Sequence, residues 1–231
     1  MLRNGRKRKV RAPIQARPGG VVLLHGIAVG SWTLKRLQRA LEAEGFATLN
    51  LDYASRRKRL DALAADCHPA ISGFAEEHGG PIHLVGHSMG GLLARVYVNK
   101  YRPEQLGRVV MLGTPNGGSE VADLLKDLAI YRTVFGPAGL QLTTEQDDTL
   151  TSLPPVDYPV GIIAGNRTIS PLSSLLILPS PNDGRVSVQS TRLPGMADHV
   201  VVKSSHTWLV RHSVAIDQTV AFLRDGQFRV N

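Results

Sequence analysis

The stretch Gly86-His87-Ser88-Met89-Gly90-Gly91 decides how this chain of 231 residues is interpreted. It follows an apolar run at 81–85 that is typical of a buried strand, and it precedes a stretch at 92–97 with helical character. Glycines two positions away on each side of a serine are typical of a very tight strand-to-helix turn, because larger side chains would collide with neighbouring backbone. Such a turn lifts the hydroxyl clear of the sheet, so Ser88 is the candidate nucleophile.

Composition and charge bound the remaining possibilities. The length and an apolar content of 42% predict one globular domain. Seven basic residues and no acid lie in residues 1–18, and the rest of the chain carries 20 basic and 19 acidic residues. We therefore expect a flexible basic arm at 1–18, with at most weak contact to a membrane surface or another anionic partner, and no specific nucleic-acid binding.

The sequence also bears on location and cofactors. No apolar run reaches the roughly 18 to 20 residues that span a membrane, and no apolar segment typical of a secretory signal follows the basic arm. The single cysteine, Cys67, excludes an intrachain disulfide, and it falls on the apolar stripe of a predicted helix, so we interpret it as core. These features predict a cytoplasmic protein with no metal site and no other cofactor.

Predicted strands and helices alternate along the chain. The strands are expected at 21–24, 46–51, 82–85, 109–112, 159–164 and 200–202. The helices are expected from a cap at Ser31 to Gly45, from Leu60 to Phe74 with a kink or early end at Pro69, from Ser88 to about Lys100, and over about 209–223. This alternation predicts one α/β domain at 19–231, a mostly parallel sheet of about six strands with helices on both faces. Residues 119–158 join two strands and predict a small cap.

A serine nucleophile needs a base, an acid that orients the base, and donors for the oxyanion. Loops at the carboxyl ends of parallel strands converge on one edge of the sheet. Of the eight histidines, His206 directly follows the last predicted strand and shares that edge with Ser88. Asp183 follows the preceding strand and comes before His206, which makes it the favoured acid. The alternatives are Asp147, Asp148, Asp157 and Asp198, and Asn182-Asp183-Gly184 is also ordinary turn chemistry.

Two backbone N–H groups are expected to bind the oxyanion. The N–H of Met89 opens the helix after Ser88 and carries partial positive charge. The N–H of Ile27 is the second donor, because Gly26 allows the loop after the first strand to turn it inward. Apolar residues at 121–135 and 172–178 either line an acyl pocket or pack within the cap and core. The pocket candidates are His25, His87, Leu124, Leu128 and Leu176.

These features resemble the α/β-hydrolase superfamily, and within it the small bacterial lipases and esterases. The resemblance covers about residues 20–225 and is carried by His25-Gly26, the Ser88 motif, Leu112 to Ser119, Asn182-Asp183-Gly184 and His206. It implies a catalytic triad in the order Ser88, Asp183, His206, with Ile27 and Met89 as oxyanion donors. The two leading antiparallel strands of larger members have no counterpart here, and the region after Ser119 is short for a large lid domain.

The predicted activity is cofactor-free hydrolysis of an uncharged acyl ester, either a small molecule or a lipid, through an acyl-enzyme. A thioesterase, an amidase or an acyltransferase would use the same triad, and the sequence does not separate these classes. A non-catalytic binding protein on a hydrolase scaffold is the remaining alternative, since a fold alone does not give a function. The intact triad argues against that alternative.

Overall fold

A computed structural model describes residues 19–118, 136–141, 148–168 and 178–229. Six strands form one sheet in the order β2-β1-β3-β4-β5-β6, and every neighbouring pair is parallel. The strands are β1 (Gly20–Leu24), β2 (Ala47–Leu51), β3 (Ile82–His87), β4 (Leu106–Leu112), β5 (Val160–Gly165) and β6 (Asp198–Val202). The predicted number of strands and their parallel arrangement are confirmed.

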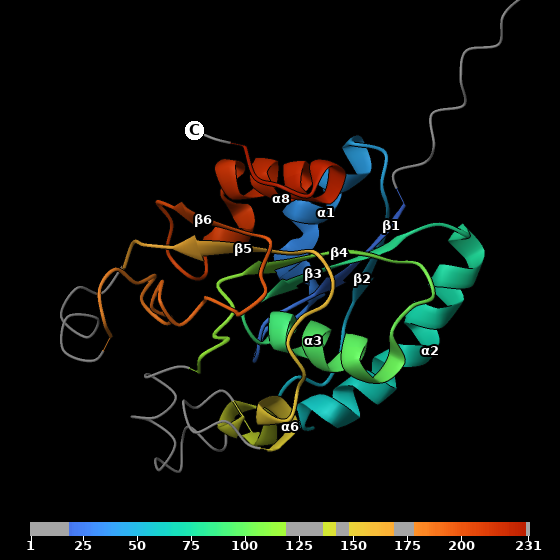
Figure 1. Ribbon diagram of the computed structural model, residues 1–231, viewed down its shortest axis with the longest axis horizontal. Coiled ribbons are helices and arrows are strands. Elements are labelled where there is room, and N and C mark those ends of the chain that lie inside the picture. Colours follow the sequence, from blue (N-terminus) through green and yellow to red (C-terminus); the bar gives the residue numbers. More distant parts are fainter. Residues whose placement is uncertain (1–18, 119–135, 142–147, 169–177, 230–231) are drawn as a thin grey trace, which may run out of the picture.

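Helices cover both faces of this sheet, as the alternating pattern predicts (Figure 1). The helix α1 and the C-terminal helix α8 lie on one face, and α2 and α3 lie on the other. Their bounds are η1 (Ser31–Leu34), α1 (Lys35–Ala43), α2 (Leu60–His78), α3 (Met89–Tyr101), α6 (Asp148–Thr151), η2 (Leu209–Arg211) and α8 (Ser213–Asp225).

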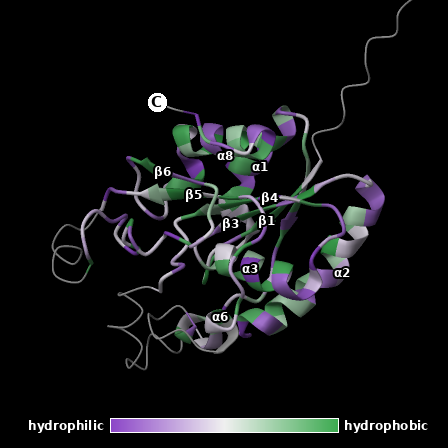
Figure 2. Cartoon of the chain, in the orientation of Figure 1, coloured by the Kyte–Doolittle hydropathy of each residue, from purple (hydrophilic) through white to green (hydrophobic). Residues whose placement is uncertain are grey.

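The central strands are apolar on both sides, which is why they read as continuous apolar runs. In β1, Val21 and Leu23 belong to the core under α1 and α8, whereas Val22 and Leu24 belong to the core under α2 and α3. All four side chains are fully buried. Figure 2 shows this as a hydrophobic centre between helices whose outer surfaces are more polar.

The strand order reverses beside β1, and this reversal creates the place for a site. The chain passes from β1 to β2 on one side and then returns to β3 on the other side of β1. In parallel sheets, ligands bind outside the carboxyl ends of the strands at such a switch point, because the loops there diverge. The loops that carry Ile27, after β1, and Ser88, after β3, both lie at this point.

Two local expectations are wrong, the cap at Ser31 and an early end of the helix at Pro69, while the alternative of a kink at Pro69 stays a prediction. Ser31 does not cap its helix: Gly30 occupies the cap position in an extended conformation, and the Ser31 N–H donates to Asp52 Oδ1 at 3.1 Å. Pro69 does not end or shorten α2, which continues to His78. The hydrogen bond that a proline removes is outweighed there by the burial of the apolar face, including Cys67 and Ile71.

Two other expectations concern parts of the chain that are mostly outside the described residues. The basic arm at 1–18 lies outside them entirely. Of the predicted cap, only 136–141 and a short segment that includes α6 are described, so the cap stays a prediction. Among the residues that the structure describes, no helix is both long and apolar enough to cross a membrane.

The start of α3 leaves no room for side chains, and this gives a test of the fold. A Cβ at Gly90 would lie 2.2 Å from the carbonyl oxygen of Leu24, whereas a Cβ at Gly73, exposed in α2, would meet nothing within 4 Å. We expect Gly90→Ala to lower the free energy of unfolding by about 3 kcal/mol or more, because backbone must move. Gly73→Ala should raise it by roughly 0.5–1 kcal/mol, because alanine favours the helix. Urea denaturation measures both, and equal effects of the two changes would contradict the packing described here.

Candidate active site

Ser88 lies at a strained turn between β3 and α3. Its φ of 54° and ψ of −124° are rare for a residue with a side chain. A Cβ at Gly86 would lie 2.5 Å from the backbone of Gly90 and Gly91, and a Cβ at Gly91 would lie 2.0 Å from Thr114 Oγ1. The turn is held by neighbouring hydrogen bonds, since Thr114 Oγ1 donates to the Ser88 carbonyl at 3.0 Å and the Ser88 N–H donates to β4 at 2.8 Å. This is the turn expected from the glycine spacing.

Asp183 and His206 form a buried pair at the same edge of the sheet. Asp183 Oδ2 lies 2.8 Å from His206 Nδ1, and the two residues are 2% and 4% exposed. The other carboxylate oxygen, Oδ1, accepts the N–H groups of Arg185 at 3.0 Å and Val186 at 2.8 Å, and the His206 N–H donates to the Asp183 carbonyl at 3.0 Å. The carboxylate therefore fixes a proton on Nδ1 and leaves Nε2 of His206 available as a base.

Two glycines make room for this pair, and sequence reasoning gave neither a role. A Cβ at Gly113, whose φ is 58°, would lie 3.2 Å from both Asp183 Oδ2 and His206 Nδ1. A Cβ at Gly165 would lie 2.8 Å from Asp183 Cβ. Gly165 ends β5 and Gly113 directly follows β4. A glycine at the carboxyl end of a parallel strand is the signal that could have found them.

The structure brings the serine turn next to the Asp183–His206 pair. The ring of His87, the residue before Ser88, lies 4.9 Å from the His206 ring, measured between centroids. Although all three residues are in the described part of the chain, no hydrogen bond joins Ser88 Oγ to His206 there. Bonds of this kind are often long in unliganded enzymes and shorten when substrate binds. The base and the serine are thus neighbours at one edge.

The predicted oxyanion donors belong to two segments that meet at the serine turn: Met89 directly follows Ser88, and Ile27 belongs to the loop after β1. A Cβ at Gly26 would lie 3.4 Å from Ser88 Cβ, so the loop after β1 touches the serine turn. Within the described residues, the backbone N–H groups of Ile27 and Met89 donate to no protein acceptor. Both N–H groups are therefore free to bind an oxygen of a substrate.

Residues after β2 hold the loop at 25–30, which is the predicted oxyanion loop because it carries the Ile27 N–H. Sequence reasoning missed these residues. The fully buried ring of His25 stacks on Tyr53 with centroids 4.0 Å apart, and the Tyr53 hydroxyl donates to the His25 carbonyl. His25 Nδ1 donates to the carbonyl of Gly26 at 2.8 Å, and burial lowers the pKa of His25. The N–H of Ala28, at a φ of 58°, donates to Ser55 Oγ at 3.2 Å. A tyrosine and a serine just after a strand carry no sequence signal for this role.

The predicted pocket residues fall into two groups. His25 and His87 are buried, at 0% and 7% exposure, with the His25 ring stacked on Tyr53 and the His87 ring next to that of His206, and their place in a substrate pocket stays a prediction. Enclosure follows from their place at the ends of fully buried strands. Leu124, Leu128 and Leu176 lie outside the described residues, so an acyl pocket formed by them stays a prediction.

The alternative acids lie in other surroundings. Asp157 pairs with Arg102 on the surface, at 2.7 and 2.8 Å from its guanidinium. Asp198 accepts backbone N–H groups of His199 and Phe228. Asp147 lies outside the described residues, as does the side chain of Asp148.

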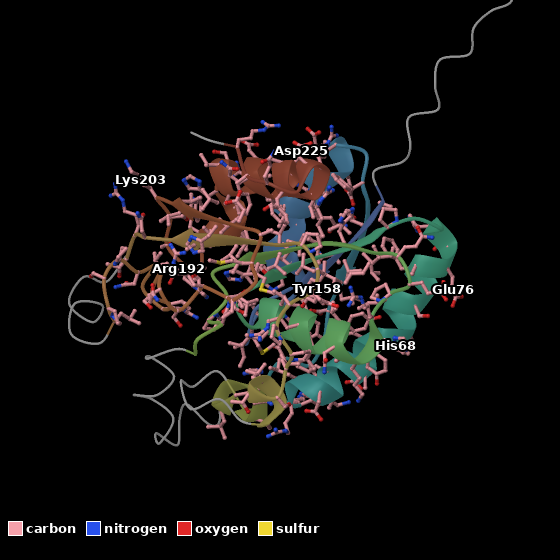
Figure 3. The ribbon with its side chains drawn as sticks, in the orientation of Figure 1. His68, Glu76, Tyr158, Arg192, Lys203 and Asp225 are labelled. Carbon is pink, nitrogen blue, oxygen red and sulfur yellow. The ribbon has the colours of Figure 1, made fainter. Side chains whose placement is uncertain are left out.

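Two other histidines and the single cysteine are engaged elsewhere in the fold. His68 stacks on Tyr101 with centroids 4.2 Å apart, and Figure 3 shows it on α2, far from Lys203, which is near His206 in the chain. His83 Nδ1 accepts the N–H of Arg108 at 2.8 Å. Cys67 is buried and its pKa is raised to about 11, mainly by burial, so it carries no thiolate at neutral pH. The structure has no metal-ligand cluster in its described part.

A parallel six-stranded sheet with a strained serine, an imidazole and a carboxylate at its carboxyl edge is the architecture of α/β hydrolases. The sequence agrees, because the model of the alpha/beta hydrolase family matches residues 21–218. The chain belongs to this family.

Curated relatives match parts of the chain. Triacylglycerol lipases from Pseudarthrobacter phenanthrenivorans and Burkholderia plantarii are each 42% identical over 62 residues, which is 27% of this chain and 18% and 16% of the lipases. Methylesterase 17 from Arabidopsis thaliana is 27% identical over 156 residues, covering 60% of this chain and 54% of that enzyme. The chain thus spans less than a fifth of the length of the two lipases and about half of the methylesterase.

Solved structures share the fold over most of the chain. The mature lipase BlEst2 from Bacillus licheniformis has a TM-score of 0.75 at 20% identity, covering 94% of this chain and 96% of that one. The phospholipase PlaB from Legionella pneumophila has a TM-score of 0.66 at 19% identity, covering 81% of this chain and 53% of that one. At these identities the likeness establishes the fold.

The buried ring of His87 gives the stability of the protein a pH dependence. Burial, together with the neighbouring His206, lowers the pKa of His87 from 6.5 to about 3. Between these values the unfolded chain binds a proton that the folded chain does not, so this contribution is complete above pH 6.5 and is lost as pH falls toward 3. We expect the free energy of unfolding to fall more steeply from pH 6.5 to 4 in the wild type than in His87→Gln, by up to about 1.4 kcal/mol per pH unit. Denaturant titrations at several pH values measure this, and parallel slopes would contradict it.

Proposed function

We propose that this protein hydrolyses carboxylic esters through a covalent acyl-enzyme, with Ser88 as nucleophile, His206 as general base and Asp183 as the acid that orients it. The observation that carries the proposal is the 2.8 Å contact between Asp183 and His206, buried beside the strained Ser88 turn. A carboxylate that fixes one imidazole nitrogen leaves the other free to take a serine proton, which a serine needs in order to react at neutral pH.

Acylation would begin when Ser88 Oγ attacks the ester carbonyl carbon and passes its proton to His206 Nε2. The carbonyl oxygen becomes an anion, and the N–H groups of Ile27 and Met89 would bind it. The imidazolium that forms on His206 is stabilised by Asp183. When the carbon–oxygen bond to the alcohol breaks, His206 returns the proton to the departing alkoxide, and the acyl group stays on Ser88.

Deacylation repeats these steps with water. His206 Nε2 takes a proton from a water molecule, whose oxygen attacks the acyl carbon, and the oxyanion again forms between Ile27 and Met89. Collapse of this intermediate breaks the bond to Ser88 Oγ, which takes the proton back from His206. The products are a carboxylic acid and an alcohol, and none of these steps calls on a cofactor.

Two observations favour an uncharged acyl ester as substrate. The relatives named above are a methylesterase and two triacylglycerol lipases, and both names denote ester-cleaving enzymes. The segments at 119–135 and 169–177 also contain clustered leucines, including Leu124, Leu128 and Leu176, which would form an apolar wall for the acyl chain.

Replacing Ser88 tests the nucleophile. We expect Ser88→Ala to lower kcat with a nitrophenyl ester by about 10³-fold or more, with little change in thermal stability, because the reacting oxygen is lost. Ser72→Ala, on the outer part of α2, is the matched control and should keep wild-type activity. Near wild-type rates in Ser88→Ala would overturn the assignment.

A panel of acyl substrates tests the reaction class. We compare an ester, a thioester and an amide that carry the same acyl group. The kcat/KM for the ester should exceed that for each of the other two by at least about tenfold, which corresponds to about 1.4 kcal/mol in the transition state. A fluorophosphonate should label the wild type at Ser88 and leave Ser88→Ala unlabelled. Preference for a thioester or amide would replace the proposed substrate class, and absence of labelling would indicate a non-catalytic protein.

A further inference from the structure

His87 has a role that neither the serine motif nor the proposed triad assigns. The residue is 7% exposed, and the centroid of its ring lies 4.9 Å from that of the His206 ring. Its Nε2 atom lies 3.1 Å from the backbone carbonyl oxygen of His206. A carbonyl only accepts hydrogen bonds, so Nε2 of His87 must carry the proton and donate it.

The other side of the His87 ring faces the oxyanion loop. A Cβ at Gly26 would lie 3.2 Å from His87 Nδ1, which means that the ring edge packs directly on the backbone of that loop. Nδ1 is buried and has no hydrogen-bond partner in the described part of the chain. One ring therefore stands between the loop of the general base and the loop that presents the Ile27 N–H.

We propose that His87 is a positioning residue: its Nε2–H holds the backbone of His206, and its ring spaces the His206 loop from the oxyanion loop at Gly26. This inference rests on the proposed function, because it assigns His87 a part in placing the groups of that reaction. An imidazole suits the position since it offers one donor at the reach of Nε2 and a flat, rigid ring.

A neutral ring is essential for this role. The titratable and charged groups that act on His87 are His206, Asp183 and Arg185. His206 becomes a cation in every cycle of the proposed reaction, and a second cation beside it would oppose that change. Burial keeps His87 uncharged, and its pKa of about 3 means that it stays so throughout the pH range in which His206 would work.

Two amide variants separate the hydrogen bond from mere filling of space. The side-chain N–H of His87→Gln reaches about as far as Nε2, whereas that of His87→Asn is too short to meet the His206 carbonyl. We expect His87→Asn to lower kcat by about 10 to 100-fold with KM changed by less than about threefold, because small displacements of a reacting group are costly. His87→Gln should restore kcat to within about threefold of the wild type.

Three outcomes decide the proposal. Wild-type kcat in His87→Asn, with circular dichroism showing that it is folded, would overturn it. Equal losses in folded Gln and Asn variants would also overturn it, because the donor would then be irrelevant. If the wild type shows no Ser88-dependent hydrolysis at all, the proposed function fails first, and the wild-type measurement below still tests the placement of His87.

Nitrogen-15 NMR of histidine-labelled wild-type protein tests the placement without any variant. After sequential assignment, the His87 signal should show its proton on Nε2 and no titration between pH 5 and 8. A His87 signal with its proton on Nδ1, or one that titrates in this range, would overturn the proposal even if the variants do not fold.

Discussion

The packing of the start of α3 against the ends of β1 and β4 is the constraint on which the rest of this site depends. Backbone meets backbone or a threonine side chain there, and Gly86, Gly90 and Gly91 leave no space for side chains of their own. This close approach forces Ser88 into its positive φ and points the N-terminus of the helix at the substrate side. The strain is local, and it is held by the hydrogen bonds from Thr114 and to Leu112.

Tight packing also fixes the side chains of Asp183 and His206. Two backbone N–H groups and the imidazole of His206 contact Asp183, so both oxygens of its buried carboxylate have hydrogen-bond donors. Gly113 and Gly165 keep the ends of β4 and β5 open for these side chains. The folded structure therefore holds the pair in one orientation, as the proposed reaction would require.

Histidines serve unlike roles at this edge because their environments differ. His206 pairs with the buried carboxylate of Asp183. Burial lowers the pKa of His25, whose Nε2 lies 3.3 Å from the exposed carboxylate of Asp52, and burial also lowers the pKa of His87. His25 lies in the loop after β1, stacked on Tyr53, and His87 contacts the loop of His206. Neutral rings can brace the site without adding charge beside the imidazolium that the reaction would form.

The fold could be predicted from local patterns in the sequence. Continuous apolar strands alternate with amphipathic helices, and such alternation leaves a parallel sheet with two helical layers as the way to bury both faces. The places where prediction failed are those where tertiary contact overrides a local rule. Pro69 is tolerated because one face of α2 is buried, and Asp52 takes the role expected of Ser31 because β2 ends beside that helix.

The sequence by itself determined the six strands, the serine turn and the placement of Ser88, Asp183 and His206 in loops at one edge, because these depend on local patterning and on strand order. Tertiary structure alone decided what His87, Tyr53, Ser55 and Gly113 do. His87 and the carbonyl that it binds are 119 positions apart in the chain. The sheet brings them within 3.1 Å through the register of its strands, and no short-range pattern records a contact made at that separation.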